Sequence, residues 1–121
     1  MACAAALETI RLLEEKYVAN AARMGEYILG RLADWPHLHR FVGQVRGRGL
    51  MIGIELVKDK ETREPNPEAR NKVIEKAFHK GLLVLGCGES TVRLMPPLII
   101  EREHADTGLE ILDSCLTEVE L

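Results

Sequence analysis

One arginine stands in a run of otherwise uncharged, strand-forming residues near the end of the sequence. The run extends from Ser90 to Ile100, and Arg93 is its only charged residue. Moving a guanidinium out of water is costly unless an anion meets it. We therefore expect a carboxylate or another anion to meet Arg93, either from elsewhere in the fold or from a ligand. Glu55 and Glu89 are the candidates for a structural salt bridge, and spacing alone leaves that alternative as open as ligand binding.

The alternation of residues along a strand predicts where Arg93 points. Val92 and Leu94 are expected to face a core that is covered by helices. With a period of two, Thr91, Arg93 and Met95 then face the opposite side of the sheet. That side is either solvated or docked against something that this chain does not contain.

Further short runs predict the rest of the sheet. Phe41 to Val45 and Leu50 to Val57 contain β-branched residues and are split by Gly47-Arg48-Gly49, which favours two strands joined by a bend. Leu82 to Leu85 is expected to pair with the Arg93 strand around a turn at Gly86-Cys87-Gly88. In the second run, four large apolar residues share one face: Leu50, Ile52, Ile54 and Leu56.

Four segments have the composition and periodicity of helices. The spacing predicts helices from Ala2 to about Lys16, from Val18 to about Asp34, and from about Glu101 to Glu120. The most strongly marked helix follows Asn66-Pro67-Glu68, an N-cap, a first-turn proline and an acid, and ends at Lys80-Gly81. Its expected buried stripe consists of Val73, Ile74, Ala77 and Phe78.

These elements together predict an α+β fold. We expect a small, mostly antiparallel sheet of three to four strands with helices covering one face, preceded by an N-terminal helical segment. Residues 1–121 are expected to form a single domain, with 1–35 as a helical lead-in and 41–121 as sheet and helices.

Composition excludes several classes of protein. Charged residues make up 29 % and apolar residues 46 %, which is too apolar for disorder. A formal net charge of -3 and 4 % aromatic residues argue against nucleic acid as a partner. No apolar run is long enough to cross a bilayer and no basic leader is present, so we expect no membrane association and a cytoplasmic location. Cys3, Cys87 and Cys115 form no disulfide or zinc pattern.

Other candidate motifs are incomplete. Gly47 to Gly53 lacks both the glycine spacing and the following helix of a dinucleotide loop. Ser90 and Cys87 could be nucleophiles, but no base accompanies either, so both are expected to be loop residues. Arg46 and Arg48 could grip an anion, although backbone geometry is a sufficient reason for their glycine neighbours. The histidines share no ligand spacing and are expected at the surface: His37, His39, His79 and His104.

Four segments, in order, resemble the C-terminal part of class III aminotransferases. These segments are Ala2–Ile10, Val45–Leu56, Lys80–Leu83 and Thr91–Leu98. The family consists of pyridoxal-phosphate enzymes and includes 4-aminobutyrate, acetylornithine and ornithine aminotransferases. The Gly86-Cys87-Gly88 turn before the arginine strand is similar to the 4-aminobutyrate branch.

The resemblance implies a division of labour between two domains. In this family a large domain carries the Schiff-base lysine, the acid at the pyridine nitrogen and the cup for the cofactor phosphate. The small C-terminal domain supplies the arginine that receives a substrate carboxylate, and that position matches Arg93. The implied activity is transfer of an amino group from an amino acid to a 2-oxo acid, within a dimer. The resemblance implies no catalytic lysine and no cofactor ligand within this chain, and the spacing of the histidines and cysteines predicts no metal ligand.

The departures from the family pattern lead to further expectations. No lysine of this chain matches the Schiff-base lysine, so the chain resembles the C-terminal piece of a longer enzyme whose large domain is its missing partner. We expect the isolated chain to hold no pyridoxal phosphate, to be inactive, and to self-associate through its exposed domain-interface surface. Two alternatives remain: an amino-acid racemase of the same family, and a non-catalytic module that binds a small anion or a partner.

Overall fold

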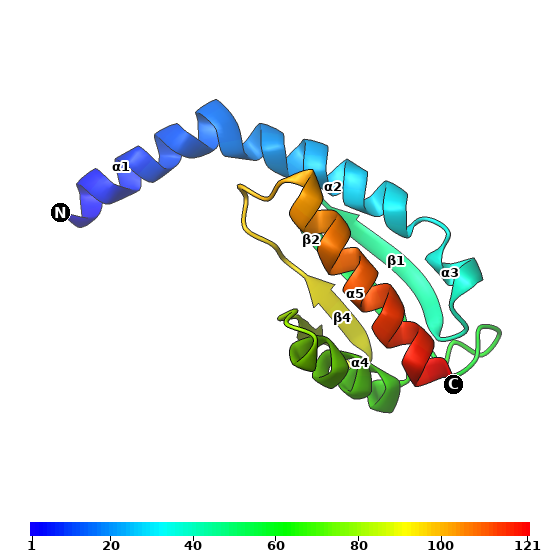
Figure 1. The fold of residues 1–121 in the computed structure, drawn as a ribbon. Helices are drawn as coiled ribbons and strands as arrows, with labels where there is room; N and C mark the ends of the chain where they lie inside the picture. The colour runs from blue at the N-terminus through cyan, green and yellow to red at the C-terminus, as the bar shows by residue number, and fades with distance from the viewer.

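A four-stranded antiparallel sheet with strand order β1-β2-β4-β3 forms the centre of the structure, a computed structural model that describes residues 1–121 (Figure 1). The strands are β1 (Val42–Arg48), β2 (Met51–Leu56), β3 (Leu85–Cys87) and β4 (Thr91–Leu94). One helix separates β2 from β3 along the chain. The predicted α+β class and the predicted antiparallel sheet are confirmed.

The first two strands form a tight hairpin. Arg48 pairs with Met51, which leaves Gly49 and Leu50 as the two turn residues. Gly49 has a φ of +56°, a value that the first residue of a two-residue hairpin turn requires and that glycine adopts without strain. The bend expected around Gly47 to Gly49 is therefore confirmed, although β1 runs on to Arg48 before the chain turns.

Three helices cover one face of this sheet: α2 (Val18–Leu32), α4 (Pro67–His79) and α5 (Arg102–Glu120) (Figure 1). The four apolar residues predicted to share a face of β2, Leu50, Ile52, Ile54 and Leu56, are all at most 5 % exposed. They pack with Val92 of β4 and with apolar residues of the helices into one core cluster. Burial of these apolar side chains provides most of the free energy that holds the helices to the sheet.

Helix α4 begins and ends as its sequence predicts. The side-chain oxygen of Asn66 accepts a hydrogen bond from the backbone N–H of Ala69 at 3.0 Å. Gly81 follows the helix with a φ of +85°. The predicted buried stripe is only partly correct, because Val73 and Ala77 are buried while the Phe78 side chain is 63 % exposed.

The N-terminal region departs from two independent helices. Helix α1 (Ala2–Leu12) continues through a π-helical segment, η1 (Leu13–Tyr17), directly into α2. Figure 1 shows α1 projecting away from the sheet, and none of its residues is buried. A short helix, α3 (Trp35–Leu38), follows the expected helix end near Asp34, because proline fits the first turn of a helix.

The edge strand lies later in the chain than expected. Leu82 to Val84 form no strand, and β3 instead includes Gly86 and Cys87, which were assigned to a turn. The turn falls on Gly88 to Ser90, where Gly88 has a φ of +55°. None of the helices is long and apolar enough to span a bilayer.

Candidate functional site

Arg93 lies in the middle of a row of residues that crosses the sheet. The register pairs Arg46 of β1 with Gly53 of β2, Gly53 with Arg93 of β4, and Arg93 with Leu85 of β3. Paired residues of antiparallel strands share a face of the sheet. Two arginines therefore lie on one face, separated by a residue without a side chain.

That face is the one opposite the helices, and we call it the open face. Val92, the neighbour of Arg93 in β4, is buried in the core, so Arg93 points the other way. A Cβ atom built on Gly53 would lie 3.0 Å from Cγ2 of Thr91, which places Thr91 on the side of Gly53 as well. The predicted orientation of Arg93 is therefore confirmed. Thr91 is 8 % exposed, because neighbouring side chains cover it.

The first carboxylate considered as a partner for Arg93 is already bound. Nη1 of Arg46 donates to Oε2 of Glu55 at 2.6 Å. Glu89 takes part in none of the ion pairs, and Arg93 is half-buried without any side-chain hydrogen bond or ion pair. The open face thus holds Arg46, which Glu55 neutralises, and the half-buried Arg93, which is available to an anion; Arg48 lies on the same face but is exposed.

This arrangement suits the recognition of a carboxylate. A guanidinium presents a planar fork of N–H donors that can bind both oxygens of a carboxylate at once. Gly53 leaves the flank of Arg93 open, since residues in such a cross-strand pair lie close together and a large side chain would crowd the guanidinium. Sequence reasoning missed the Arg46–Glu55 pair, although counting back from the two-residue turn at Gly49-Leu50 aligns these strands.

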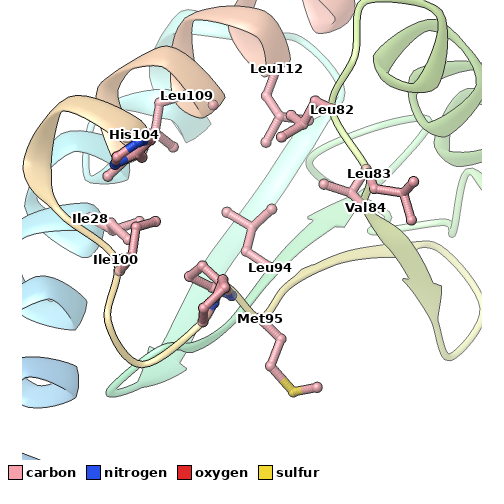
Figure 2. Close-up of a pocket in the computed structure, with 14 residues that line it drawn as sticks. Ile28, Leu82, Leu83, Val84, Leu94, Met95, Ile100, His104, Leu109 and Leu112 are labelled. Atoms are coloured by element: carbon pink, nitrogen blue, oxygen red, sulfur yellow. The ribbon is translucent and has the colours of Figure 1, made fainter. Parts of the chain in front are cut away.

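An apolar pocket lies on the other side of the sheet. Figure 2 shows Leu94 pointing into it together with residues of α5, whereas Met95 points away. The pocket has a volume of about 300 Å³, and His104 is its one ionisable residue. Because Leu94 faces the helices and Arg93 faces away from them, this pocket is separate from the Arg93 site.

The lysines of the chain lie mostly beside acceptors of the chain itself. The ammonium groups of Lys58, Lys72, Lys76 and Lys80 are held by glutamates. Lys60 donates to the backbone carbonyl of Pro36, and Lys16 lies near Arg23 at the junction of η1 and α2. No lysine lines the apolar pocket. Five of the six lysine ammonium groups thus have an acceptor within the chain.

The remaining candidates also lack a catalytic arrangement. Ser90 is buried at the start of β4 and Cys87 is exposed on the edge strand. Cys115 is buried in the core, and this burial raises the pKa of its thiol. No group of three or more histidine, cysteine, aspartate or glutamate side chains could hold a metal ion.

One histidine departs from the expected surface position. His39 is 4 % exposed and packs edge-on against the Trp35 ring, with a centroid distance of 5.2 Å. Its two ring nitrogens face carboxylate oxygens of Asp113 at 2.9 Å and Glu120 at 3.4 Å. These contacts connect the end of α3 to the C-terminal half of α5, which indicates a structural role for His39.

Comparison with known proteins relates the whole chain to one family. Residues 1–116 match the family described as aminotransferase class-III. A leucine/methionine racemase from Thermococcus litoralis is 40 % identical over 99 % of this chain, and a 4-aminobutyrate aminotransferase from Mycobacterium leprae is 41 % identical over 96 %. A Bacillus anthracis aminotransferase structure covers 97 % of the chain with a TM-score of 0.91 and 34 % identity.

The matched relatives are much longer than this chain. The alignments cover 27 % of the T. litoralis racemase, 26 % of the M. leprae aminotransferase and 28 % of the B. anthracis structure. The chain therefore spans about a quarter of the length of the relatives that it matches.

Proposed function

The chain belongs to the aminotransferase class III family, and we propose that its part in the reaction is to bind a substrate carboxylate through Arg93. The reaction that we propose for the longer protein is transfer of an amino group from an amino acid to a 2-oxo acid. Pyridoxal phosphate, when bound by the longer protein, supplies the electron sink at the substrate's α-carbon. The residues of this chain bind and orient the carboxylate.

The observation that carries this proposal is the availability of Arg93. Arg93 is half-buried on the open face, and no acid of the chain neutralises it. Glu55 is the acid nearest in the register, since it pairs with Thr91, and Arg46 holds it. A guanidinium that is partly desolvated and unpaired gains most from an incoming anion.

Binding at Arg93 would contribute to catalysis by orientation. A carboxylate that is held at two points can turn only slightly, so the amino group of the same substrate is directed to one place. The rest of the open face, with Met51 exposed, would be covered by the large domain that we propose as the partner of this chain.

Substitution of Arg93 in the enzyme that contains this chain tests the proposal. We expect Arg93→Ala to lower kcat/KM for the amino acid by about 100-fold, because a charged hydrogen-bonded contact is lost. The absorbance of the bound cofactor should not change. The matched control is Arg48→Ala on the same face, for which we expect less than a twofold effect. An unchanged kcat/KM for Arg93→Ala would remove the proposed role.

Racemisation is a second candidate, because relatives with that activity are as similar as the aminotransferases. A leucine/methionine racemase and an isoleucine 2-epimerase from Lentilactobacillus buchneri are 40 % and 41 % identical to this chain. Incubation with an L-amino acid in deuterium oxide, without a 2-oxo acid, separates the two. A racemase accumulates the D-isomer labelled at the α-carbon, whereas an aminotransferase stops after the first half-reaction, because no 2-oxo acid is present to accept the amino group.

For the isolated chain we propose that no covalent cofactor site exists. The six lysines include none placed for a Schiff base, so adding pyridoxal phosphate should give no specific aldimine absorbance. A stable band that borohydride reduces, at one lysine only, would contradict this. Calorimetric titration with amino acids tests the alternative of a ligand-binding module, because saturable binding by the chain alone would favour it.

A further inference from the structure

The sheet has a free edge at β3, and the register shows which backbone groups it offers. The backbone carbonyl of Ser90 accepts a hydrogen bond from the N–H of Leu56 at 2.9 Å, so the backbone N–H and C=O of Ser90 point toward β2. The backbone N–H and C=O groups of successive strand residues point to opposite sides, so those of Thr91 and Arg93 point toward β3. Gly86 lies between the β3 partners of these two residues, so its N–H and C=O point away from β4, toward the free edge.

A groove runs beside this edge, between α4 and the segment that leads into β3. It has a volume of about 400 Å³, and its apolar wall consists of Ile74, Phe78, Leu83, Val84 and Leu85. Phe78 is 63 % exposed and Leu83 is 76 % exposed. We call this feature the edge groove. Its strand segment, from Leu82 to Gly88, contains no charged residue or proline that would protect an edge from pairing.

Arg70 lies over Gly86 and is next in sequence to Asn71, which lines the edge groove, while Gly86 follows Leu85 of its strand side. Its Nη1 would lie 2.1 Å from a Cβ atom on Gly86, so the guanidinium passes directly over that glycine. Its Nε is buried and has no hydrogen-bond partner. Arg70 also takes part in no ion pair. A cation in this position can be satisfied by an acceptor that approaches along the edge.

Arg70 lies just outside the lining of the edge groove, and the one charged residue within the lining is Glu75. It lines the groove five residues after Arg70, about 7.5 Å further along the helix axis. It has no ion-pair partner either. The two charges would orient a bound segment, because an acidic side chain is favoured near Arg70 and disfavoured beside Glu75.

We propose that the edge groove binds an extended segment of another protein, with apolar residues at alternate positions and one carboxylate. The segment would pair with the backbone of Gly86, cover Leu83 and Leu85 with its apolar side chains, and place its carboxylate on Arg70. Because β3 has only three residues, backbone bonds alone would be few, and the side-chain contacts supply the remaining affinity. The groove does not include Arg93, although Leu85 is the β3 partner of Arg93, so the proposed contact at the sheet edge is separate from carboxylate binding by Arg93.

A second copy of the chain matches the charges less well. Antiparallel pairing of two β3 strands about Gly86 would place Glu89 of one copy opposite Leu83 of the other. That position is three residues, about 10 Å, from Gly86, over which Arg70 lies. Glu89 is the acid next to β3 in the sequence, so self-pairing leaves Arg70 without an anion.

Selection from a random peptide library tests the proposal and requires no candidate partner protein. The library is displayed on phage and selected on the immobilised chain, on the Arg70→Gln chain and on the Arg48→Gln control. We expect enriched sequences that alternate apolar residues and share one Asp or Glu. The acid should disappear from the Arg70→Gln selection and persist in the control. Absence of enrichment, or an acid that persists with Arg70→Gln, would overturn the proposal.

A synthetic peptide from the selection then tests strand pairing without altering the protein. N-methylation of one set of alternate residues should weaken binding at least tenfold, and N-methylation of the other set should not, because only one set pairs with the edge. Equal effects of both sets would overturn strand pairing. Sedimentation of the free chain completes the test, since a dimer that the peptide dissociates would assign the groove to a second copy instead.

Discussion

The two faces of the sheet differ in what their residues contribute. The face beneath α2, α4 and α5 carries Ile52, Ile54 and Val92, each 1 % exposed, and it provides the core. The open face carries Glu55 and Arg93 from the same two strands, together with Arg46 from β1. Because side chains alternate along a strand, adjacent residues can serve stability and recognition separately. Substitutions on the two faces should therefore affect different measurements.

Substitutions on the two faces of β2 should differ most in their effect on the free energy of unfolding. We expect Ile54→Ala to lower the free energy of unfolding by about 2–5 kcal/mol, because it removes buried atoms and leaves a cavity. Met51→Ala, on the open face where Met51 is 61 % exposed, should change it by less than about 0.5 kcal/mol. Urea unfolding of both variants provides the measurement. Equal losses would show that the open face also contributes to the folded core.

Two glycines of α2 differ in how closely other parts of the chain pack against them. A Cβ atom on Gly25 would lie 2.2 Å from the backbone oxygen of Gly49, so α2 can approach the hairpin only with glycine there. We expect Gly25→Ala to cost about 1–3 kcal/mol. Gly30 has nothing within 4 Å, and Gly30→Ala should stabilise the helix by about 0.5–1 kcal/mol. A neutral Gly25→Ala would contradict this close packing.

The start of α4 gives a smaller effect. We expect Asn66→Ala to cost about 1 kcal/mol, since the bond from Ala69 N–H to the Asn66 side chain is lost. Asn66→Asp keeps an acceptor at the N-cap and should be close to the natural chain. Thermal unfolding of the two variants is the measurement, and equal losses would show that the cap bond does not contribute.

Substitution of Glu118, on the outer surface of the helix layer, should have the smallest effect on stability, and this effect should depend on pH. Lys76 and Lys80 hydrogen-bond to the Glu118 carboxylate and lower its pKa to about 2 from an ordinary value of 4.5. Glu118 therefore stabilises the native state above pH 4.5, and this contribution is lost as the pH falls toward 2. The Tm of the natural chain should exceed that of Glu118→Gln by at most about 3 °C at pH 6, and the two should converge at pH 2. Glu26→Gln, at an exposed residue without an ion pair, is the control.

Local patterns predicted the parts of the fold that depend on local rules. The alternation in Leu50 to Leu56 identified the core face of β2, and Asn66-Pro67 with Gly81 identified the ends of α4. The π-helical segment at Leu13–Tyr17 and the exposure of Phe78 depend on how the helices meet the sheet, which periodicity does not encode. The predicted position of β3 was wrong because the sequence does not distinguish Gly86 from Gly88. Only Gly88 adopts a positive φ.

The site was predictable to a similar extent. The direction of Arg93 follows from alternation with the buried Val92, and the structure confirms it. The capture of Glu55 by Arg46 required the hairpin register. The edge groove required the tertiary position of α4 against β3, which brings Arg70 over Gly86, sixteen residues away in the chain.

Recognition of a substrate carboxylate by Arg93 is tested most directly by a comparison of two substrates. In the longer enzyme, kcat/KM is measured for an amino acid and for the amine that lacks its carboxylate, with and without Arg93→Ala. We expect the substitution to lower kcat/KM by about 100-fold for the amino acid and by less than threefold for the amine. Equal losses for both substrates would contradict carboxylate recognition, because Arg93 would then act on both substrates alike.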